Sequence, residues 1–445
     1  QLIEVLFMKK YHLLTGMQDL LPEELSIWQA LESVLREWIA LYAYGEIRTP
    51  ILEMYELFAR SVGEETDIVG KEMYRFVDQS EEQVVLRPEG TASVLRAVIE
   101  HNYLYNGPRK LWYYGPMFRR ERPQKGRYRQ FHQFGVEVLG FAKVQADIEL
   151  LAMIYELWRR LGINDQITLQ INTLGTYEER QRYRHSLISY LRTYASILDE
   201  DSRRRLTTNP LRILDSKNPA LQRICEDSPK LIDSLVKNSP SLIFYDQLKE
   251  GLHALNIPYQ ENPRLVRGLD YYNHTVFEWV TDQLGSQATL CAGGRYNGLL
   301  SALGSKNDVP GTGFALGMER LVLLLQQQKN FSKPTTSYSQ TKVKNTVFYL
   351  ISQGDEALNK GLRYATMLRQ KGWQIYIPFF SSQKMSSQFQ KANKFGARYA
   401  LIIGEEEVKN HVINIKDLTG RQGQREFEAS SEPEMLSQAL YQWIE

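Results

Sequence analysis

The chain has 445 residues, of which 43% are apolar and 24% charged, and its formal net charge at pH 7 is +2. This length is enough for two or three packed domains, and the composition is not that of a disordered protein. The longest apolar runs, such as Leu321 to Leu325, are far shorter than the roughly 20 residues that cross a bilayer, so no membrane contact is expected. The start of the sequence lacks the basic and apolar regions of a secretion signal, and a cytoplasmic location is expected.

Cys225 and Cys291 are the two cysteines, and they lie far apart without the spacing of metal ligands. This pattern argues against both a disulfide framework and a structural zinc site, and it fits a reducing compartment. The sequence does not identify ligands for any other metal. Because the net charge is small, nucleic-acid binding must be argued from local clusters of basic residues.

The part of the chain before residue 329 predicts a long helix near its start and several strands after it. Apolar residues recur at helical spacing from Leu21 to Ile39, which predicts a long helix with one buried face. Residues 46–53 are β-like but interrupted by Pro50, which favours a sheet edge or a subunit boundary. Further runs predict strands of a mostly antiparallel sheet, followed by a helix from Glu319 onward. The strand-like runs are residues 84–88, 109–118, 129–140, 274–281 and 312–317.

Composition and periodicity divide the chain into three predicted domains and a linker. Residues 8–175 and 259–328 predict the two halves of one α+β domain, and residues 176–258 predict a charged helical insertion between them. Residues 329–341 are polar and without periodicity, as in a linker. Residues 342–445 alternate strands and helices, which predicts a separate small α/β domain. It has no GxGxxG fingerprint, so a dinucleotide site is not expected there.

A basic cluster lies between two of the predicted strands. Six basic residues fall within eleven positions: Arg119, Arg120, Arg122, Lys125, Arg127 and Arg129. A charge run is often only a solvated surface. Strands on both sides, however, would hold several guanidinium groups on a rigid scaffold, where they can bind phosphate oxygens in pairs. We therefore expect a phosphate-binding loop.

Several segments resemble class II aminoacyl-tRNA synthetases, and in particular the histidyl-tRNA synthetase family. The segment from FRRE to Arg127 resembles the second signature motif of the class, GTGFALGMERLVLLL the third, and AYGEIRTPILE the dimer-forming first motif. LVRGLDYYNHTVFEW and CAGGRYNGLL resemble the two peptides peculiar to the histidine family, and LRPEGT resembles its substrate loop. The resemblance implies a class II antiparallel sheet with flanking helices, a helical insertion module and a C-terminal α/β anticodon-binding domain.

The same resemblance implies a two-step reaction. L-Histidine would react with ATP to give histidyl-adenylate and pyrophosphate, and histidine would then pass to the 3′-OH of the terminal adenosine of the histidine tRNA. It also implies Mg²⁺, a homodimer, and contacts of the tRNA acceptor stem with the insertion and of the anticodon with the C-terminal domain. The alternative is a noncatalytic, histidine-sensing regulatory paralogue of histidine biosynthesis, which generally lacks the C-terminal domain and intact histidine peptides.

Three arginines would be catalytic by this resemblance. Arg119 would contact the α-phosphate and the carboxylate of histidine, and Arg320 the γ-phosphate. Arg267 would stabilise charge on the α-phosphate, where other members of the class use an additional metal ion. Together with Arg119 and Arg320, Glu121 and Arg127 would bind ATP.

The amino-acid pocket needs an anion for the substrate ammonium and polar partners for both imidazole nitrogens. By resemblance, Glu89, Thr91 and Gln133 hold the α-amino group, Glu137 and Tyr272 read the imidazole, and Tyr271 lines the same pocket. Such a pocket leaves buried polar groups unpaired when an apolar amino acid enters, which permits discrimination of roughly 10⁴ or more without editing. The full histidine-binding set implied is Glu89, Thr91, Arg119, Gln133, Glu137, Arg267, Tyr271 and Tyr272.

Two positions depart from the family pattern. Asn297 stands where the family usually has an aspartate, so a charge-based role at this position is in doubt. His274 stands where an arginine usually follows the asparagine. In the C-terminal domain, the basic candidates for RNA contacts are Lys384, Lys391, Lys394 and Arg398, although a solvated helix face would show the same pattern.

Overall fold

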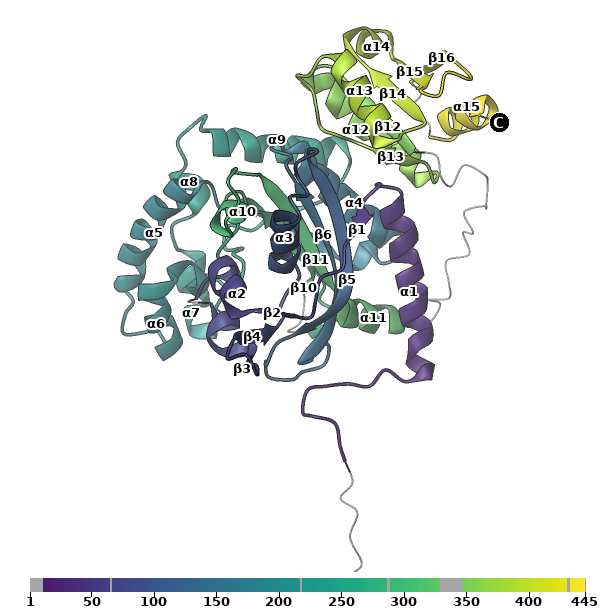
Figure 1. Ribbon diagram of the computed structural model, residues 1–445. Helices are drawn as coiled ribbons and strands as arrows, with labels where there is room; N and C mark the ends of the chain where they lie inside the picture. The colour runs from purple at the N-terminus through teal and green to yellow at the C-terminus, as the bar shows by residue number, and fades with distance from the viewer. Residues whose placement is uncertain are drawn as a thin grey trace, which may run out of the picture.

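The computed structural model describes residues 11–64, 66–216, 218–285, 289–328, 347–429 and 433–444. The expected linker at 329–341 and the expected starts of the first and last domains, at 8–10 and 342–346, lie outside the described residues. Figure 1 shows a large sheet with helices on both faces, a group of helices beside it, and a smaller domain made from the C-terminal part of the chain.

The first helix, α1 (Pro22–Ala40), confirms the helix predicted from apolar spacing. Proline occupies its first position and Glu23 and Glu24 its first turn, where both the fixed backbone of proline and negative charge favour helix initiation. Its buried face packs on the sheet and consists of Trp28, Ala30, Leu31, Val34, Leu35, Trp38 and Ile39.

Within the described residues, eight strands form the large sheet in the order β1-β5-β6-β11-β10-β9-β7-β8. The inner pairs from β5 to β7 are antiparallel, whereas the edge pairs β1–β5 and β7–β8 are parallel. The mostly antiparallel sheet is therefore confirmed. Its strands are β1 (Gly45–Glu46), β5 (Arg109–Phe118), β6 (Gln130–Leu139), β7 (Thr168–Thr173), β8 (Gln260–Glu261), β9 (Asn273–Val280), β10 (Thr289–Arg295) and β11 (Gly311–Gly317).

The run at 84–88 differs from the expectation, because it belongs to a second, smaller sheet. There β4 (Gln83–Leu86) pairs with β2 (Leu52–Met54) and β3 (Tyr74–Val77). Arg87 directly follows β4 and donates hydrogen bonds to the carbonyl oxygens of Pro116 and Thr49, at 3.0 and 2.9 Å. These side-chain bonds tie the small sheet to the end of β5, although β4 is not a strand of the large sheet.

The β-like run around Pro50 forms two short strands, β1 and β2, one on each side of the proline. Both are edge strands, of the large and the small sheet respectively. Proline has no N–H to donate to a ladder, so the chain leaves one sheet at this point and enters the other. The edge position predicted for this run is confirmed.

Alternating side chains of the strands face two apolar clusters, one on each face of the large sheet. On β5, Trp112 packs into the cluster with α1, α4 (Gln145–Leu161) and α11 (Met318–Gln326), while Leu111 and Tyr113 pack into the other. The helix expected from Glu319 onward is thereby confirmed as α11. The second face is covered by α3 (Thr91–Glu100), α10 (Leu299–Ala302) and helices of the inserted segment, and α2 (Tyr55–Val62) packs on α3.

The charged segment after residue 176 is helical, as expected. Its helices are α5 (Tyr177–Arg192), α6 (Glu200–Thr208), α7 (Pro219–Glu226), α8 (Leu231–Ser234) and α9 (Pro240–Ala254). Helix α9 packs directly on α4, where a Cβ on Gly251 would lie 2.3 Å from the Ile148 side chain. The absence of a side chain at Gly251 therefore permits close helix packing at this end of the insertion.

The C-terminal part is a separate α/β domain. In its sheet, ordered β13-β12-β14-β15-β16, the first three strands are parallel and the last two join antiparallel. The predicted βαβ alternation is confirmed for the parallel strands. The strands are β12 (Val347–Ser352), β13 (Gln374–Tyr376), β14 (Tyr399–Ile403), β15 (Val412–Asp417) and β16 (Gln424–Glu428). The helices are α12 (Asp355–Gln370), α13 (Met385–Phe395), α14 (Glu405–Asn410) and α15 (Pro433–Ile444).

A buried ion triad joins this domain to the large sheet. Glu149 on α4 accepts from Lys110 on β5 at 2.6 Å and from Arg369 on α12 at 2.9 Å. Burial lowers the pKa of Lys110 to about 8. Because a buried charge without its partner is strongly destabilising, the triad fixes how the two domains sit together. Among the described residues, no helix is both long and apolar enough to cross a membrane.

Candidate active site

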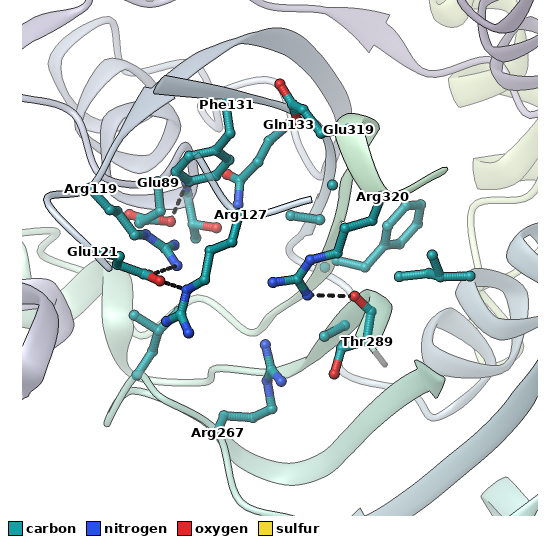
Figure 2. Close-up of a pocket in the computed structure, with 18 of the residues that line it drawn as sticks. Glu89, Arg119, Glu121, Arg127, Phe131, Gln133, Arg267, Thr289, Glu319 and Arg320 are labelled. Atoms are coloured by element: carbon teal, nitrogen blue, oxygen red, sulfur yellow. Dashed lines mark hydrogen bonds and ion pairs between the residues drawn. The ribbon is translucent and has the colours of Figure 1, made fainter. Parts of the chain in front are cut away.

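A cavity opens over the middle of the large sheet, and it gathers residues from distant parts of the sequence. Its walls come from the loop before α3, the loop between β5 and β6, the segment before β9, the strands β6, β10 and β11, and the start of α11. Every predicted site residue except Glu137 lines it: Glu89, Thr91, Arg119, Glu121, Arg127, Gln133, Arg267, Tyr271, Tyr272 and Arg320. Figure 2 shows the guanidinium groups of four arginines facing one another across this space.

One end of the cavity is cationic, and its arginines are held by carbonyl oxygens. Arg119 donates from Nε to the Pro88 carbonyl at 2.9 Å, and its guanidinium lies 5.2 Å from the centre of the Phe131 ring. Arg320 donates to the carbonyls of Thr289 at 2.7 Å and Gly126 at 3.3 Å. Each arginine is thus fixed by one edge, which orients the planar group toward the cavity.

The cationic groups repel one another in the absence of an anion. Burial, with the neighbouring charges of Arg127 and Arg119, lowers the pKa of Arg320 to about 10. Glu121 forms ion pairs with Arg127 and, at 3.9 Å, with Arg119, and so offsets part of this charge. A polyanion placed among the three arginines would relieve the remaining repulsion, as the phosphates of ATP would.

Arg267 faces the other arginines from the opposite wall (Figure 2). Its Nη1 pairs with Glu278 on β9, whereas its Nε is buried and has no hydrogen-bond partner among the described residues. Burial opposes the charge, but Glu278 and the neighbouring Tyr272 and Tyr271 raise its pKa, so the group stays charged. A fixed cation with an unused donor suits an oxygen anion.

The other end of the cavity carries groups suited to an amino acid. Glu89 caps α3, because its carboxylate accepts the backbone N–H groups of Thr91 at 2.7 Å and Ala92 at 2.8 Å. Burial raises its pKa, and those two backbone bonds act in the opposite direction. Gln133 on β6 has a buried Oε1 with no hydrogen-bond partner in the described part of the chain. A carboxylate and an unpaired amide oxygen are acceptors for a substrate ammonium group.

Glu137 lies behind the cavity wall, in a network of hydroxyl groups. Thr91 donates to its Oε1 at 2.7 Å, and the hydroxyl of Tyr296 donates to its Oε2. Burial raises the pKa of Glu137 to about 8, although both hydroxyl bonds lower it. Thr91 and Tyr296 themselves line the cavity. Since their protons are directed at Glu137, their oxygen lone pairs are available to an N–H donor in the cavity.

Close packing around this network requires glycine at two positions of β11. A Cβ on Gly313 would lie 2.4 Å from Oε2 of Glu137, and one on Gly311 would lie 2.3 Å from the ring of Tyr296. Either side chain would displace the carboxylate or the tyrosine. The glycines of this strand therefore belong to the construction of the site.

The two departures from the family pattern have local explanations. Asn297 uses Oδ1 as an acceptor, from the backbone N–H of Gly311 at 3.2 Å and from Arg295 at 3.4 Å. An amide and a carboxylate can both accept these bonds. His274 has a φ of +48°, in the left-handed region that histidine tolerates better than most residues, and its ring packs on Phe244.

Several cavity residues were not singled out from the sequence. Tyr296 lay within the quoted peptide CAGGRYNGLL but received no role, and its ring meets those of Tyr271 and Tyr272 at 5.7 and 6.4 Å. Phe131 precedes Gln133 by two positions on β6, so both point to the same face of the strand. That alternation could have identified Phe131. The contact of Tyr296 with Glu137 joins positions 159 residues apart and left no sequence signal.

Comparison with known proteins agrees with this arrangement. Residues 16–321 match the family model of histidyl-tRNA synthetase, and residues 346–436 match that of an anticodon-binding domain. A histidine–tRNA ligase of Neisseria meningitidis serogroup C / serotype 2a is 50% identical, over 98% of this chain and 99% of the relative. One from Laribacter hongkongensis is 50% identical over 92% and 94%. The apo crystal structure of S. aureus histidyl-tRNA synthetase aligns with a TM-score of 0.59 at 35% identity, covering 96% of this chain and 100% of that one.

The sheet, the cationic cavity and the C-terminal domain together define a class II aminoacyl-tRNA synthetase. Within that class, the chain belongs to the histidyl-tRNA synthetase family.

Proposed function

We propose that this chain activates L-histidine with ATP, giving histidyl-adenylate and pyrophosphate, and transfers the histidine to the 3′-OH of the terminal adenosine of the histidine tRNA. The observation that carries this proposal is a single cavity with two chemically different ends. One end has arginines on opposite walls, and the other has acceptors for an ammonium group and an imidazole N–H. ATP and histidine would meet where these ends join.

The arginines act on the phosphates. Arg119 and Arg267, from opposite walls, hold the α-phosphate, and Arg119 also orients the histidine carboxylate that attacks it. Arg320 holds the γ-phosphate, and Arg127 with Glu121 fixes the nucleotide. Charge builds on the α-phosphate oxygens as the carboxylate attacks, so preorganised cations there lower the activation barrier.

The remaining groups select histidine. Glu89, Thr91 and Gln133 receive the α-amino group, while Tyr272 and the network of Glu137 receive the imidazole. Tyr271 closes the aromatic wall beside Tyr272, with ring centres 4.6 Å apart. An apolar amino acid in this place leaves these buried polar groups unpaired, which disfavours its activation.

Mg²⁺ fits the phosphate end as a companion of ATP. In the described part of the chain, no three His, Cys, Asp or Glu side chains are grouped to hold a metal by themselves. Mg²⁺ usually binds through one or two carboxylates together with substrate phosphates, and Glu121 and Glu319 are carboxylates of this cavity. When bound, the ion would neutralise charge on the pyrophosphate leaving group.

The C-terminal domain would read the anticodon. Lys391 and Lys394 of α13 line a cleft with the aromatic side chains of Tyr349, Phe380 and Phe395. Basic and aromatic groups side by side suit single-stranded RNA, whose bases stack on rings. Lys384 and Arg398 lie at or just beyond the two ends of the same helix and add to its positive charge.

We also propose a homodimer in the cytoplasm. The first-motif strand region exposes Ile51, Leu52 and Met54, and β3, the opposite edge strand of the same small sheet, exposes Phe76 and Val77. An apolar surface at a sheet edge is suited to a protein partner. The two buried, unpaired cysteines, Cys225 and Cys291, are those expected in a reducing compartment.

The test is aminoacylation of histidine tRNA by the full chain, run beside histidine-dependent ATP–pyrophosphate exchange. The proposal expects both activities. Histidine binding without either activity would support the alternative of a regulatory sensor, and exchange without charging would contradict the transfer step. Sedimentation of the same preparation tests the dimer.

A further inference from the structure

A second cavity adjoins the active site on the side of the helical insertion. It shares Arg267 and Leu269 with the first cavity, so the two lie side by side along the segment before β9. Its other walls come from α5 and from the short helix that follows α6. Neither ATP nor histidine, as placed above, occupies this space.

The lining of the second cavity is strongly cationic. Four arginines contribute to it, Arg180, Arg184, Arg212 and Arg267, against one acidic residue, Asp270. The carboxylate of Asp270 already accepts a hydrogen bond from Asn209 at 2.6 Å. A cavity with this balance of charge is suited to an anion with several negative groups.

The arginines of this cavity differ in how far they are used within the protein. Arg180 donates to the backbone carbonyl of Tyr272, and Arg184 donates to those of Thr207 and Thr208, at 3.1 and 3.2 Å. These two hold the walls together. The guanidinium of Arg212, in contrast, makes no side-chain hydrogen bond or ion pair with any residue that the structure describes, although the charges of Asp67 and Glu72 act on it through space. Its donors are therefore available to a ligand.

Arg212 also reaches the active-site segment. A Cβ on Gly268 would lie 3.2 Å from Nη1 of Arg212, so the guanidinium rests against the backbone of the residue that follows Arg267. Glycine at 268 leaves room for this approach. The guanidinium of Arg212, which comes from the insertion, therefore lies next to the segment that carries Arg267.

We propose that this second cavity binds phosphodiester groups of the single-stranded 3′ end of the tRNA, with Arg212 as its main phosphate ligand. This inference rests on the proposed function, since the terminal 3′-OH must reach the adenylate beside Arg267 and the preceding nucleotides must leave by an adjoining space. Arg212 would guide the chain without touching the reacting atoms. It is a positioning residue, and its loss should affect transfer and not activation.

The experiment compares Arg212→Ala with the wild-type chain in two assays. The KM for tRNA in aminoacylation should rise about tenfold, which is the effect of losing one charged hydrogen bond. Because one phosphate contact is lost, the slope of the logarithm of tRNA affinity against the logarithm of salt concentration should decrease in size by about one. Arg212→Lys, which retains the charge without the fork of donors, should give a smaller rise. Histidine-dependent pyrophosphate exchange, which needs no tRNA, should stay at the wild-type rate.

The matched control is Arg223→Ala, on α7 of the same insertion, whose side chain is 93% exposed and lines neither cavity. It should leave the KM for tRNA unchanged. An unchanged KM in Arg212→Ala, or an equal rise in the control, overturns the proposal. So does an equal loss of exchange, which would place Arg212 at the nucleotide. Failure of the wild-type chain to charge tRNA would instead contradict the proposed function itself.

Discussion

The two ends of the active-site cavity are built on different principles. The end proposed for the phosphates consists of long, partly buried arginines that are fixed either by backbone carbonyls or by carboxylates and face a shared space. The end proposed for histidine consists mainly of hydroxyl and carboxyl groups that are buried at the sheet and bonded to one another or to backbone N–H groups, with one unpaired amide oxygen, that of Gln133, among the described residues. The first end supplies charge, and the second supplies a fixed pattern of donors and acceptors. Damage to the first should therefore reduce the rate with any substrate, and damage to the second should reduce selectivity for histidine.

The largest effect is expected at the phosphate end, in Arg267→Ala. The loss of one preorganised cation beside the α-phosphate should cost on the order of 3 kcal/mol in the activation step, or more than a hundredfold in rate. Pyrophosphate exchange measures it. Arg264→Ala is the matched control, because this nearby arginine forms an ion pair with Glu226 at 3.6 Å, on the surface, and does not line the cavity. Near-normal exchange in Arg267→Ala would remove Arg267 from the mechanism.

A smaller and more selective effect is expected at the histidine end, in Tyr296→Phe. Without its hydroxyl, Glu137 loses one donor, and the KM for histidine should rise about tenfold, or about 1.4 kcal/mol, with the KM for ATP unchanged. Since the hydrogen bond from Tyr296 lowers the pKa of Glu137, its loss should shift the pH dependence of histidine binding to higher pH.

Tyr183→Phe controls for this substitution. Tyr183 is also buried, its hydroxyl donates to the Pro229 carbonyl at 2.7 Å, and it does not line the cavity. A rise in the KM for both substrates in Tyr296→Phe, or in the control as well, would indicate general loosening and not a role in selecting histidine.

The raised pKa of Glu137 should also make the free energy of unfolding depend on pH. Burial raises its pKa from 4.5 to about 8, so between these values the folded chain holds a proton that the unfolded chain has released. Stability from this group is therefore full at low pH and declines as the pH rises toward 8. Relative to Glu137→Gln, the free energy of unfolding of the wild type should fall by up to about 1.4 kcal/mol per pH unit in this window. If the free energy of unfolding of the two chains changes equally with pH in this window, the raised pKa of Glu137 is contradicted.

The smallest effect is expected for Asn297→Asp, which restores the residue usual in the family. Both side chains accept the bonds from Gly311 and Arg295, so kcat/KM for histidine should change by about twofold or less. A larger gain in kcat/KM would show that a negative charge at position 297 contributes to the binding of ATP or of histidine.

The sequence predicted the phosphate end better than the histidine end. Arginines in a loop between strands are visible as a local cluster, and the strands β5 and β6 on either side formed where expected. The contact between Tyr296 and Glu137 depends on the pairing of β6, β11 and β10, which no local pattern encodes. The resemblance supplied Glu137 as a site residue, but its place behind Thr91 and Tyr296 required the structure.

In the fold, too, the elements with a local sequence pattern were predicted and those that depend on distant pairing were not. Long periodic segments such as α1 and the strands of the large sheet were predicted, because burial of one face fixes their pattern. The assignment of residues 84–88 to a separate small sheet was not, since a short apolar run pairs with whichever strand the chain brings near. There the run pairs with β2 and β3, and the side-chain bonds of Arg87 tie it to the end of β5.

The most direct test of the account is ATP–pyrophosphate exchange by the full chain, screened over all twenty amino acids. A cavity with a general phosphate end and a selective imidazole end predicts strong exchange with histidine and exchange lower by roughly 10⁴ with apolar amino acids. Exchange stimulated by another amino acid but not by histidine would contradict it.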